Sequence, residues 1–256
     1  MGQKQVVQEL PVSSANSPIS ARIVFTQGGK GGVGKTAFAS MLVEWYKTRG
    51  VDIALLDMDA ENKAQGSLNH FFHEARKTNV QRARGLDDFL DMIDAGASIV
   101  IADMGGGSGE VAQKWFSSMY EPAQENGIAF TAVGLVTPDP ASVSAVLWWA
   151  QFLQQRVEYL IVRNALTEPA DFGYWETDPE AEKFRTAFRP AEVSMQFRLP
   201  EIENEAREAG LTIHAVAERR AAVSPMLSTT ASVFRAQAYR RSIFAELDRV
   251  KDLLLL

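Results

Sequence analysis

One glycine-rich segment near the amino terminus constrains this chain more than any other feature. It reads Gly29-Lys30-Gly31-Gly32-Val33-Gly34-Lys35-Thr36 and satisfies the pattern G-x-x-x-x-G-K-S/T. A β-prone run at 22–26 precedes it, and apolar residues at helical spacing follow at 36–47. In this context the glycines let backbone N–H groups point at phosphate oxygens, and the helix amino terminus adds a positive dipole end. The residues predicted to contact a nucleotide are Gly29, Gly31, Gly32, Val33, Gly34, Lys35, Thr36 and Ala37.

The side chains around this loop have the chemistry that phosphoryl transfer needs. Lys35 is predicted to reach the β- and γ-phosphates, and the hydroxyl of Thr36 to bind Mg²⁺. Two later strands end in carboxylates, because Asp57 and Asp59 follow one of them and Asp103 follows the other. Phosphoryl transfer depends on positioning and charge neutralisation, so carboxylates at these strand ends suit a site that holds a nucleotide and a magnesium ion.

Apolar strands alternate with helical segments along most of the chain. After the first strands, 129–136 and 158–162 are predicted strands, and 85–95, 108–125 and 141–155 are predicted helices. Near-continuous apolar strands that alternate with helices are typical of a parallel sheet covered on both faces. We therefore predict an α/β fold of the P-loop NTPase kind, with a doubly wound, mostly parallel sheet and helices on both faces.

The length of 256 residues favours one domain. Residues 1–21 are polar and lack a clear period, so we expect a flexible arm before a single domain at 22–256. The stretch 165–195 interrupts the alternation of strands and helices. It has six carboxylates and no Lys or Arg between Glu168 and Glu182, and we predict an acidic insertion there.

Composition excludes several other classes of function. Cys is absent, which rules out disulfides, thiolate metal sites and cysteine nucleophiles. The formal net charge is −6, so contact with nucleic acid or anionic lipid requires a local basic patch. No apolar run reaches the roughly 18 residues that span a bilayer, and the amino-terminal stretch is polar rather than signal-like. We expect a cytoplasmic protein.

Lys30 adds a more specific resemblance. The run from Lys30 to Thr36 resembles the deviant Walker A motif of the ParA/MinD family of ATPases. Asp57-Met58-Asp59 resembles the Walker A′ segment of that family, and Asp103-Met104-Gly105-Gly106 resembles its Walker B motif and switch II. The resemblance implies ATP as the nucleotide and an ATP-dependent sandwich homodimer, in which Lys30 crosses to the nucleotide of the second subunit.

The resemblance also implies roles for single residues. Asp59 would orient the attacking water and would be catalytic together with Lys30 and Lys35. Asp57 would lie near Mg²⁺, and Asp103 would hold the metal through water. Gly106, in switch II, would bring its N–H toward the γ-phosphate, and Asn164 would contact the adenine edge. From the residues alone, the aspartates could instead cap the next segment, and Asn164 could be a turn residue.

Two departures from the family pattern concern hydrolysis. Relatives usually have Pro-Pro after the Walker B aspartate, where this chain has Gly105-Gly106-Gly107. The expected Pro-Gln after the A′ aspartates is Ala60-Glu61. These departures leave ATP binding intact, while the hydrolysis rate and the subfamily stay open. We expect slow hydrolysis that an unidentified partner protein stimulates.

The carboxyl-terminal region is basic although the whole chain is acidic. From Arg219 to Lys251 seven basic residues stand against two acidic ones, a local balance of +5. Clustered Arg can neutralise DNA phosphates without sequence preference, as ParA-like relatives do, and this would bring the protein to the nucleoid. Dispersed surface charge is the alternative. The candidate DNA-binding residues are Arg219, Arg220, Arg235, Arg240 and Arg241.

An apolar stripe overlaps this basic region. Its members are Ile243, Phe244, Leu247, Val250 and Leu254, with Arg240, Arg241 and Lys251 beside it. Such a pattern fits either a closing helix packed on the domain or an interfacial membrane helix like that of MinD relatives. We favour the closing helix and do not expect a membrane partner.

The sequence as a whole predicts a ParA/MinD-like ATPase. It would dimerise on ATP, reset by hydrolysis and serve as a switch in DNA partition, positioning or transfer. The alternative is a metabolic enzyme of the same superfamily, in which ATP activates a carboxylate for amide formation or ligation. A small substrate would be needed for turnover in the second case and not in the first.

Overall fold

The computed structural model describes residues 18–27, 29–58, 66–80, 82, 84–105 and 109–256. Its centre is a seven-stranded sheet with the order β3-β2-β4-β1-β5-β6-β7, and all neighbouring strands are parallel. The strands are β1 (Ala21–Thr26), β2 (Ala54–Met58), β3 (Arg76–Lys77), β4 (Ile99–Met104), β5 (Ile128–Val136), β6 (Glu158–Asn164) and β7 (Ala191–Met195). The predicted doubly wound parallel sheet is confirmed.

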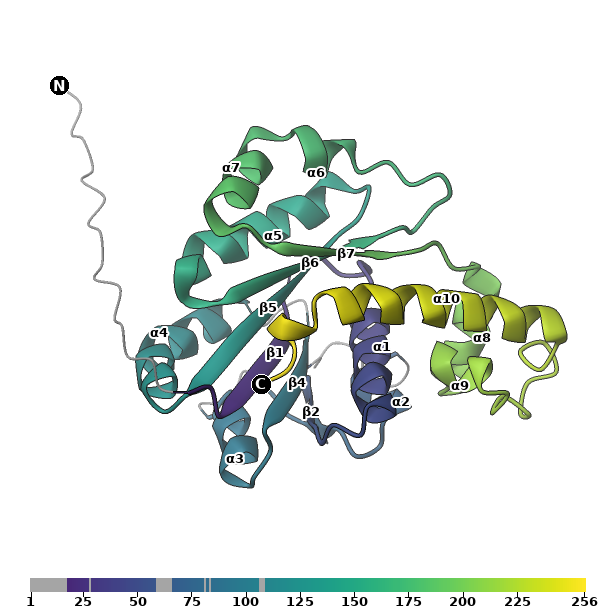
Figure 1. Ribbon diagram of the computed structural model, residues 1–256, viewed down its shortest axis with the longest axis horizontal. Coiled ribbons are helices and arrows are strands. Elements are labelled where there is room, and N and C mark those ends of the chain that lie inside the picture. The colour runs from purple at the N-terminus through teal and green to yellow at the C-terminus, as the bar shows by residue number, and fades with distance from the viewer. Residues whose placement is uncertain (1–17, 28, 59–65, 81, 83, 106–108) are drawn as a thin grey trace.

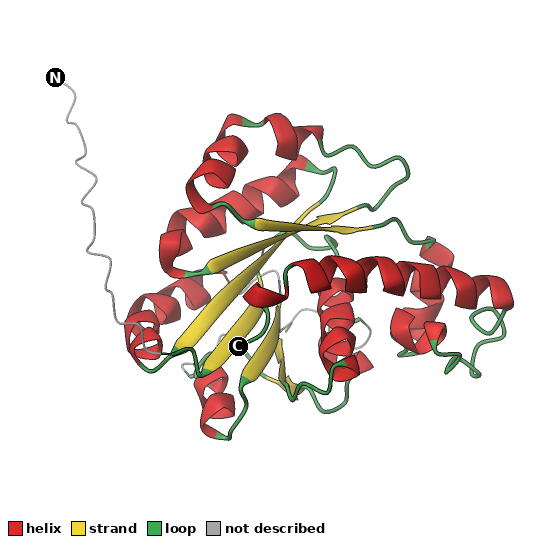
Figure 2. Ribbon diagram, viewed as in Figure 1, coloured by secondary structure: helices red, strands yellow, loops and turns green. Residues whose placement is uncertain are grey.

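Helices connect successive strands and cover both faces of the sheet (Figures 1 and 2). The α-helices are α1 (Lys35–Thr48), α2 (Leu68–Phe71), α3 (Asp88–Asp94), α4 (Gly109–Glu125), α5 (Pro140–Leu153), α6 (Gly173–Thr177), α7 (Pro179–Phe188), α8 (Pro200–Glu208), α9 (Ile213–Ala217) and α10 (Thr230–Arg249). Two 3-10 turns, η2 (Gln154–Arg156) and η3 (Lys251–Leu253), follow α5 and α10. Within the described chain, no helix is long and apolar enough to cross a membrane.

Alternation along the strands divides the core into two layers. In β1, Ile23 and Phe25 face α3, α4, α5 and α7, whereas Val24 faces α1 and α10. The strands are apolar on both faces because both faces are covered, as the near-continuous apolar runs indicate. The carboxyl ends of β1, β2, β4 and β6 therefore meet at one edge of a rigid sheet, and the glycine-rich loop emerges there.

The acidic stretch that we expected as an insertion at 165–195 forms α6, α7 and β7. Trp175, Ala181 and Phe184 point into the core, while most of the carboxylates of the stretch lie on the exposed side. The exposed charges mask the apolar pattern, which explains why the sequence reading missed a strand here. Most of the predicted arm at 1–21 lies outside the described residues, and β1 begins at Ala21.

The apolar stripe of the carboxyl-terminal helix is buried against α1. Ile243, Leu247, Val250 and Leu254 are at most 5% exposed and belong to the same core layer as α1. Figure 1 shows α10 lying across α1. This helix closes one face of the domain, as we expected.

Candidate functional site: a phosphate loop at the carboxyl edge of the sheet

The glycine-rich loop connects β1 to the amino terminus of α1. Gly29, Gly32 and Gly34 have φ values of 126°, 76° and 94°, in the region that L side chains rarely adopt. Gly34 is the N-cap of α1 in the left-handed conformation, and as a glycine it has no side chain that could cap this helix end. Residues 29–32 are exposed. The loop therefore leaves its backbone N–H groups and the positive end of α1 open to an anion.

The two lysines of the motif have different partners. The ammonium of Lys35 donates a 3.0 Å hydrogen bond to the carbonyl of Lys30, so it stays over its own loop. The side chain of Lys30 is 44% exposed, and its Nζ lies 3.2 Å from Oδ2 of Asp139. Asp139 is the N-cap of α5 and accepts a hydrogen bond from the N–H of Ala141. This N–H and then Lys30 lower the pKa of Asp139.

The predicted metal ligands converge next to the loop. Asp57 and Asp103 are register partners on the neighbouring strands β2 and β4, and both are buried. The hydroxyl of Thr36 donates to Oδ2 of Asp103 at 2.5 Å, and the hydroxyl of Thr26 donates to Oδ1 at 3.0 Å. Asp57 accepts a 2.9 Å hydrogen bond from the backbone N–H of Asn69. A hydroxyl and two carboxylates are hard oxygen donors, which fit Mg²⁺.

The ionisation of Asp103 also suits a cation site. Burial raises the pKa of Asp103 to about 6, and the nearby Asp57 carboxylate adds to the rise. Hydrogen bonds from Thr36 and Thr26 and the charge of Lys35 act in the opposite direction. A divalent ion would stabilise the ionised carboxylate, so metal binding and loss of this proton are linked.

Asn164 holds the phosphate loop from behind. It ends β6, is fully buried, and its side-chain amide donates a 2.8 Å hydrogen bond to the carbonyl of Val33. Its oxygen faces the guanidinium of Arg198, with 3.4 Å between Oδ1 and Nη1. Arg198 also donates to the hydroxyl of Tyr239 at 3.0 Å and to Glu203 at 2.9 Å. A buried polar network thus joins α10 and the β7–α8 connection to the loop.

Some of these groups were missed by sequence reasoning, and others cannot be placed. Thr26 could have been inferred, because it is the last residue of β1 and β1 pairs with β4. Asp139 and Arg198 have no local signal, since their partners lie far away in the chain. The predicted catalytic Asp59 and the switch residue Gly106 lie outside the described residues.

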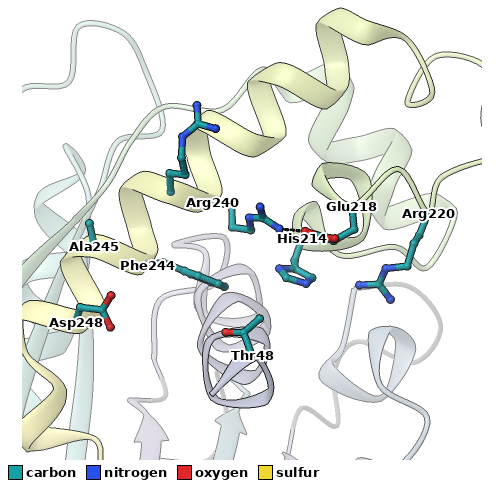
Figure 3. A pocket seen from close by; sticks show the side chains of 9 residues that line it. Thr48, His214, Glu218, Arg220, Arg240, Phe244, Ala245 and Asp248 are labelled. Carbon is teal, nitrogen blue, oxygen red and sulfur yellow. Dashed lines mark hydrogen bonds and ion pairs between the residues drawn. The ribbon is translucent and has the colours of Figure 1, made fainter. Parts of the chain in front are cut away.

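The five candidate DNA-binding arginines are divided by the structure. Arg220, Arg240 and Arg241 line one open groove of about 660 Å³ beside α1, α9 and α10, here called the arginine groove (Figure 3). Arg219 and Arg235 are exposed and do not line it. Arg240 forms an ion pair with Glu218. The groove adjoins Thr48 at the end of α1, whereas the phosphate loop adjoins its start.

The fold and the loop together define a P-loop nucleotide-binding protein. The sequence profile of the CobQ/CobB/MinD/ParA nucleotide-binding domain matches residues 24–237. The chain belongs to this family, which confirms the ParA/MinD resemblance.

Solved structures support the same fold. A chain of the MinC:MinD cell division protein complex of Aquifex aeolicus is 12% identical with a TM-score of 0.55, and the match covers 91% of this chain and 96% of that chain. The MinD cell division protein of Aquifex aeolicus is 14% identical with a TM-score of 0.51, and the match covers 91% and 97%. A comparison with curated proteins gives no match.

Proposed function

We propose that this protein is an ATP-driven switch that dimerises across two bound nucleotides and returns to the monomer after hydrolysis. The placement of Lys30 is the observation that carries the proposal. Its side chain lies on the exposed rim of the loop, and among the described residues its ion-pair partner is a surface carboxylate, Asp139. An exposed ion pair of this kind contributes at most about 1 kcal/mol, so it can readily exchange for a phosphate of a second subunit.

Each group at the site has a role in this proposal. Backbone N–H groups of the loop and Lys35 would bind the phosphates of ATP. Thr36 and Asp103 would hold Mg²⁺, with Asp57 beside them, and the ion when bound would neutralise charge on the β- and γ-phosphates. Asp59 would orient the attacking water, as the family resemblance implies. Positioning and charge neutralisation together account for most of the chemistry of phosphoryl transfer.

The output of the switch would be binding. The basic carboxyl-terminal region would contact duplex DNA without sequence preference through Arg219, Arg220, Arg235, Arg240 and Arg241. Because the whole chain has a net charge of −6, the rest of the surface would not attract DNA. The MinD neighbour found in a complex with MinC also supports a partner protein, which here would stimulate hydrolysis. Dimerisation would double the number of phosphate contacts, so the ATP-bound dimer would bind DNA more tightly than the monomer.

Light scattering with ATP and Mg²⁺ tests the dimer. The wild type should dimerise, Lys35→Ala should lose ATP binding, and Lys30→Ala should bind ATP yet stay monomeric. A Lys30→Ala protein that still dimerises on ATP would overturn the sandwich arrangement. Adding duplex DNA over a salt series tests the output, because each neutralised phosphate contributes about −0.9 to the slope of log K against log salt.

A further inference from the structure

One side of α5 is exposed and carries no charge. The 16 residues from 140 to 155 contain no Asp, Glu, Lys or Arg, although 23% of the whole chain is charged. Each of the other described helices of ten or more residues has charged side chains on its exposed side. At 3.6 residues per turn, the exposed residues of α5 fall within about 100° around the helix axis and form one surface, here called the α5 face. They are Pro140, Ala141, Ser144, Trp148 and Gln151.

Trp148 is the large apolar side chain of the α5 face. It is 42% exposed, whereas Trp45, Trp149 and Trp175 are at most 1% exposed. Its ring lies against the start of α4, because a Cβ added at Gly109 would lie 2.9 Å from the nearest ring carbon. Trp149 packs edge-on against it, with 5.7 Å between ring centroids. The ring is therefore held in place by its neighbours while part of its surface stays open to solvent.

The α5 face adjoins the phosphate loop. Asp139, the N-cap of α5, is the carboxylate that pairs with Lys30 at 3.2 Å. Ala145 borders the face and lies so close to the loop that a Cβ added at Gly29 would be 3.3 Å from the Cβ of Ala145. The helix α4, whose first residue touches Trp148, follows the predicted Walker B and switch II segment in the chain. The loop, the α5 face and the start of α4 thus border one another.

We propose that the α5 face packs against the same face of a second copy of this chain in the ATP-bound dimer, with Trp148 as the main contact. The inference rests on the proposed function, in which two copies meet at their phosphate loops and Lys30 crosses between them. A two-fold axis that relates the two loops also brings together the surfaces that border them. The interface would therefore extend beyond the nucleotides onto α5.

The absence of charge favours a second copy as the occupant of this face. In an interface with two-fold symmetry, a residue near the axis meets its own copy, so a charge there would face a charge of the same sign. A face made of Pro, Ala, Ser, Gln and Trp avoids this repulsion. The cores of protein interfaces are likewise poor in charged residues and rich in aromatic ones, and Trp is among the residues that contribute most to binding.

Analytical ultracentrifugation of the full chain with ATP and Mg²⁺ tests the role of Trp148. Trp148→Ala should weaken the ATP-dependent dimer at least tenfold, because it removes the largest apolar contact of the face. The affinity of the monomer for ATP should stay the same. Phe234→Ala is the matched control, since Phe234 is 58% exposed on α10, which packs on the other face of the sheet. A Trp148→Ala dimer as tight as that of Phe234→Ala would overturn the inference.

A charge swap at Ser144 tests whether the face meets its own copy. Ser144→Asp and Ser144→Lys each place like charges opposite one another, so each variant alone should dimerise more weakly with ATP, and less so in high salt. An equimolar mixture of the two should dimerise more tightly than either alone, because opposite charges then meet. Energy transfer between differently labelled chains measures the mixed dimer. Two weakened variants that do not rescue each other would overturn the pairing of this face with itself.

The same measurements separate this inference from the proposed function. A wild-type chain that stays monomeric with ATP and Mg²⁺ would overturn both. If the wild type dimerises and Lys30→Ala does not, while the variants of Trp148 and Ser144 dimerise like the wild type, then the sandwich arrangement stands and the contact through α5 is wrong.

Discussion

The side-chain amide of Asn164 donates a hydrogen bond to the carbonyl of Val33, with 2.8 Å between the two atoms. This contact ties the end of β6 to the back of the phosphate loop. The fit is close, since a Cβ added at Gly34 would lie 2.4 Å from the same amide nitrogen. Asn164 therefore sets the position of the loop.

Gly34→Ala should weaken nucleotide binding at least tenfold. Its φ of 94° strains any L side chain, and the new Cβ would collide with Asn164. Adding Asn164→Ala removes the collision but leaves the backbone strain, so the double variant should regain only part of the lost affinity. Titration of a fluorescent nucleotide on all four proteins gives the coupling. Strictly additive effects would contradict a direct contact.

Asp103→Asn should change how stability depends on pH. The folded pKa of Asp103 is raised to about 6, above its unfolded value, so the native state holds this proton more tightly. The wild type, free of metal and nucleotide, should therefore lose stability as pH rises from about 4 to about 6, by at most about 3 kcal/mol. Urea unfolding should show that loss in the wild type and not in Asp103→Asn. The same variant should lose Mg²⁺-dependent nucleotide binding, and parallel pH profiles would contradict the assignment.

Asp139 should restrain Lys30, and two substitutions separate this effect from helix capping. Asp139→Ser keeps a capping side chain for α5 and removes the ion pair, so the ATP-dependent dimer should tighten by about twofold to fivefold. Asp139→Ala removes both and should also lower the free energy of unfolding by about 1 kcal/mol. Analytical ultracentrifugation and thermal unfolding provide the two readouts. A weaker dimer in Asp139→Ser would show that Asp139 assists dimerisation.

Arg198 should position the loop through Asn164. Arg198→Gln removes the cation that bridges Asn164, Glu203 and Tyr239, and we expect weaker nucleotide binding together with lower stability. Tyr239→Phe removes one hydrogen bond and should lower the free energy of unfolding by about 1 kcal/mol. A purely structural role would make nucleotide affinity follow stability in both variants. If Arg198 positions the loop, Arg198→Gln should lose more nucleotide affinity than Tyr239→Phe at temperatures where both variants are fully folded.

Local patterns were enough to predict the phosphate loop and most of the sheet. Residues 29–36 are consecutive in the chain. The positive φ values of Gly29, Gly32 and Gly34 need only the conformational freedom of glycine. Asp57 and Asp103 were found because parallel strands bring their carboxyl ends to one edge. Such features depend on the spacing of apolar residues and on turn-forming residues, and both can be read from a short stretch of sequence.

Tertiary structure alone decided which distant side chains meet. Asn164 and Val33 are 131 residues apart, and Arg198 and Tyr239 are 41 apart. The pairing of Lys30 with Asp139 and the gathering of His214 with Arg220 and Arg241 likewise depend on how helices pack on the sheet. This packing depends on the burial of whole helix and sheet faces and on the closure of long loops. Neither can be predicted from a local sequence pattern. For that reason the sequence determined the phosphate loop and the two carboxylates beside it, whereas only the fold decided what holds the loop and what lines the arginine groove.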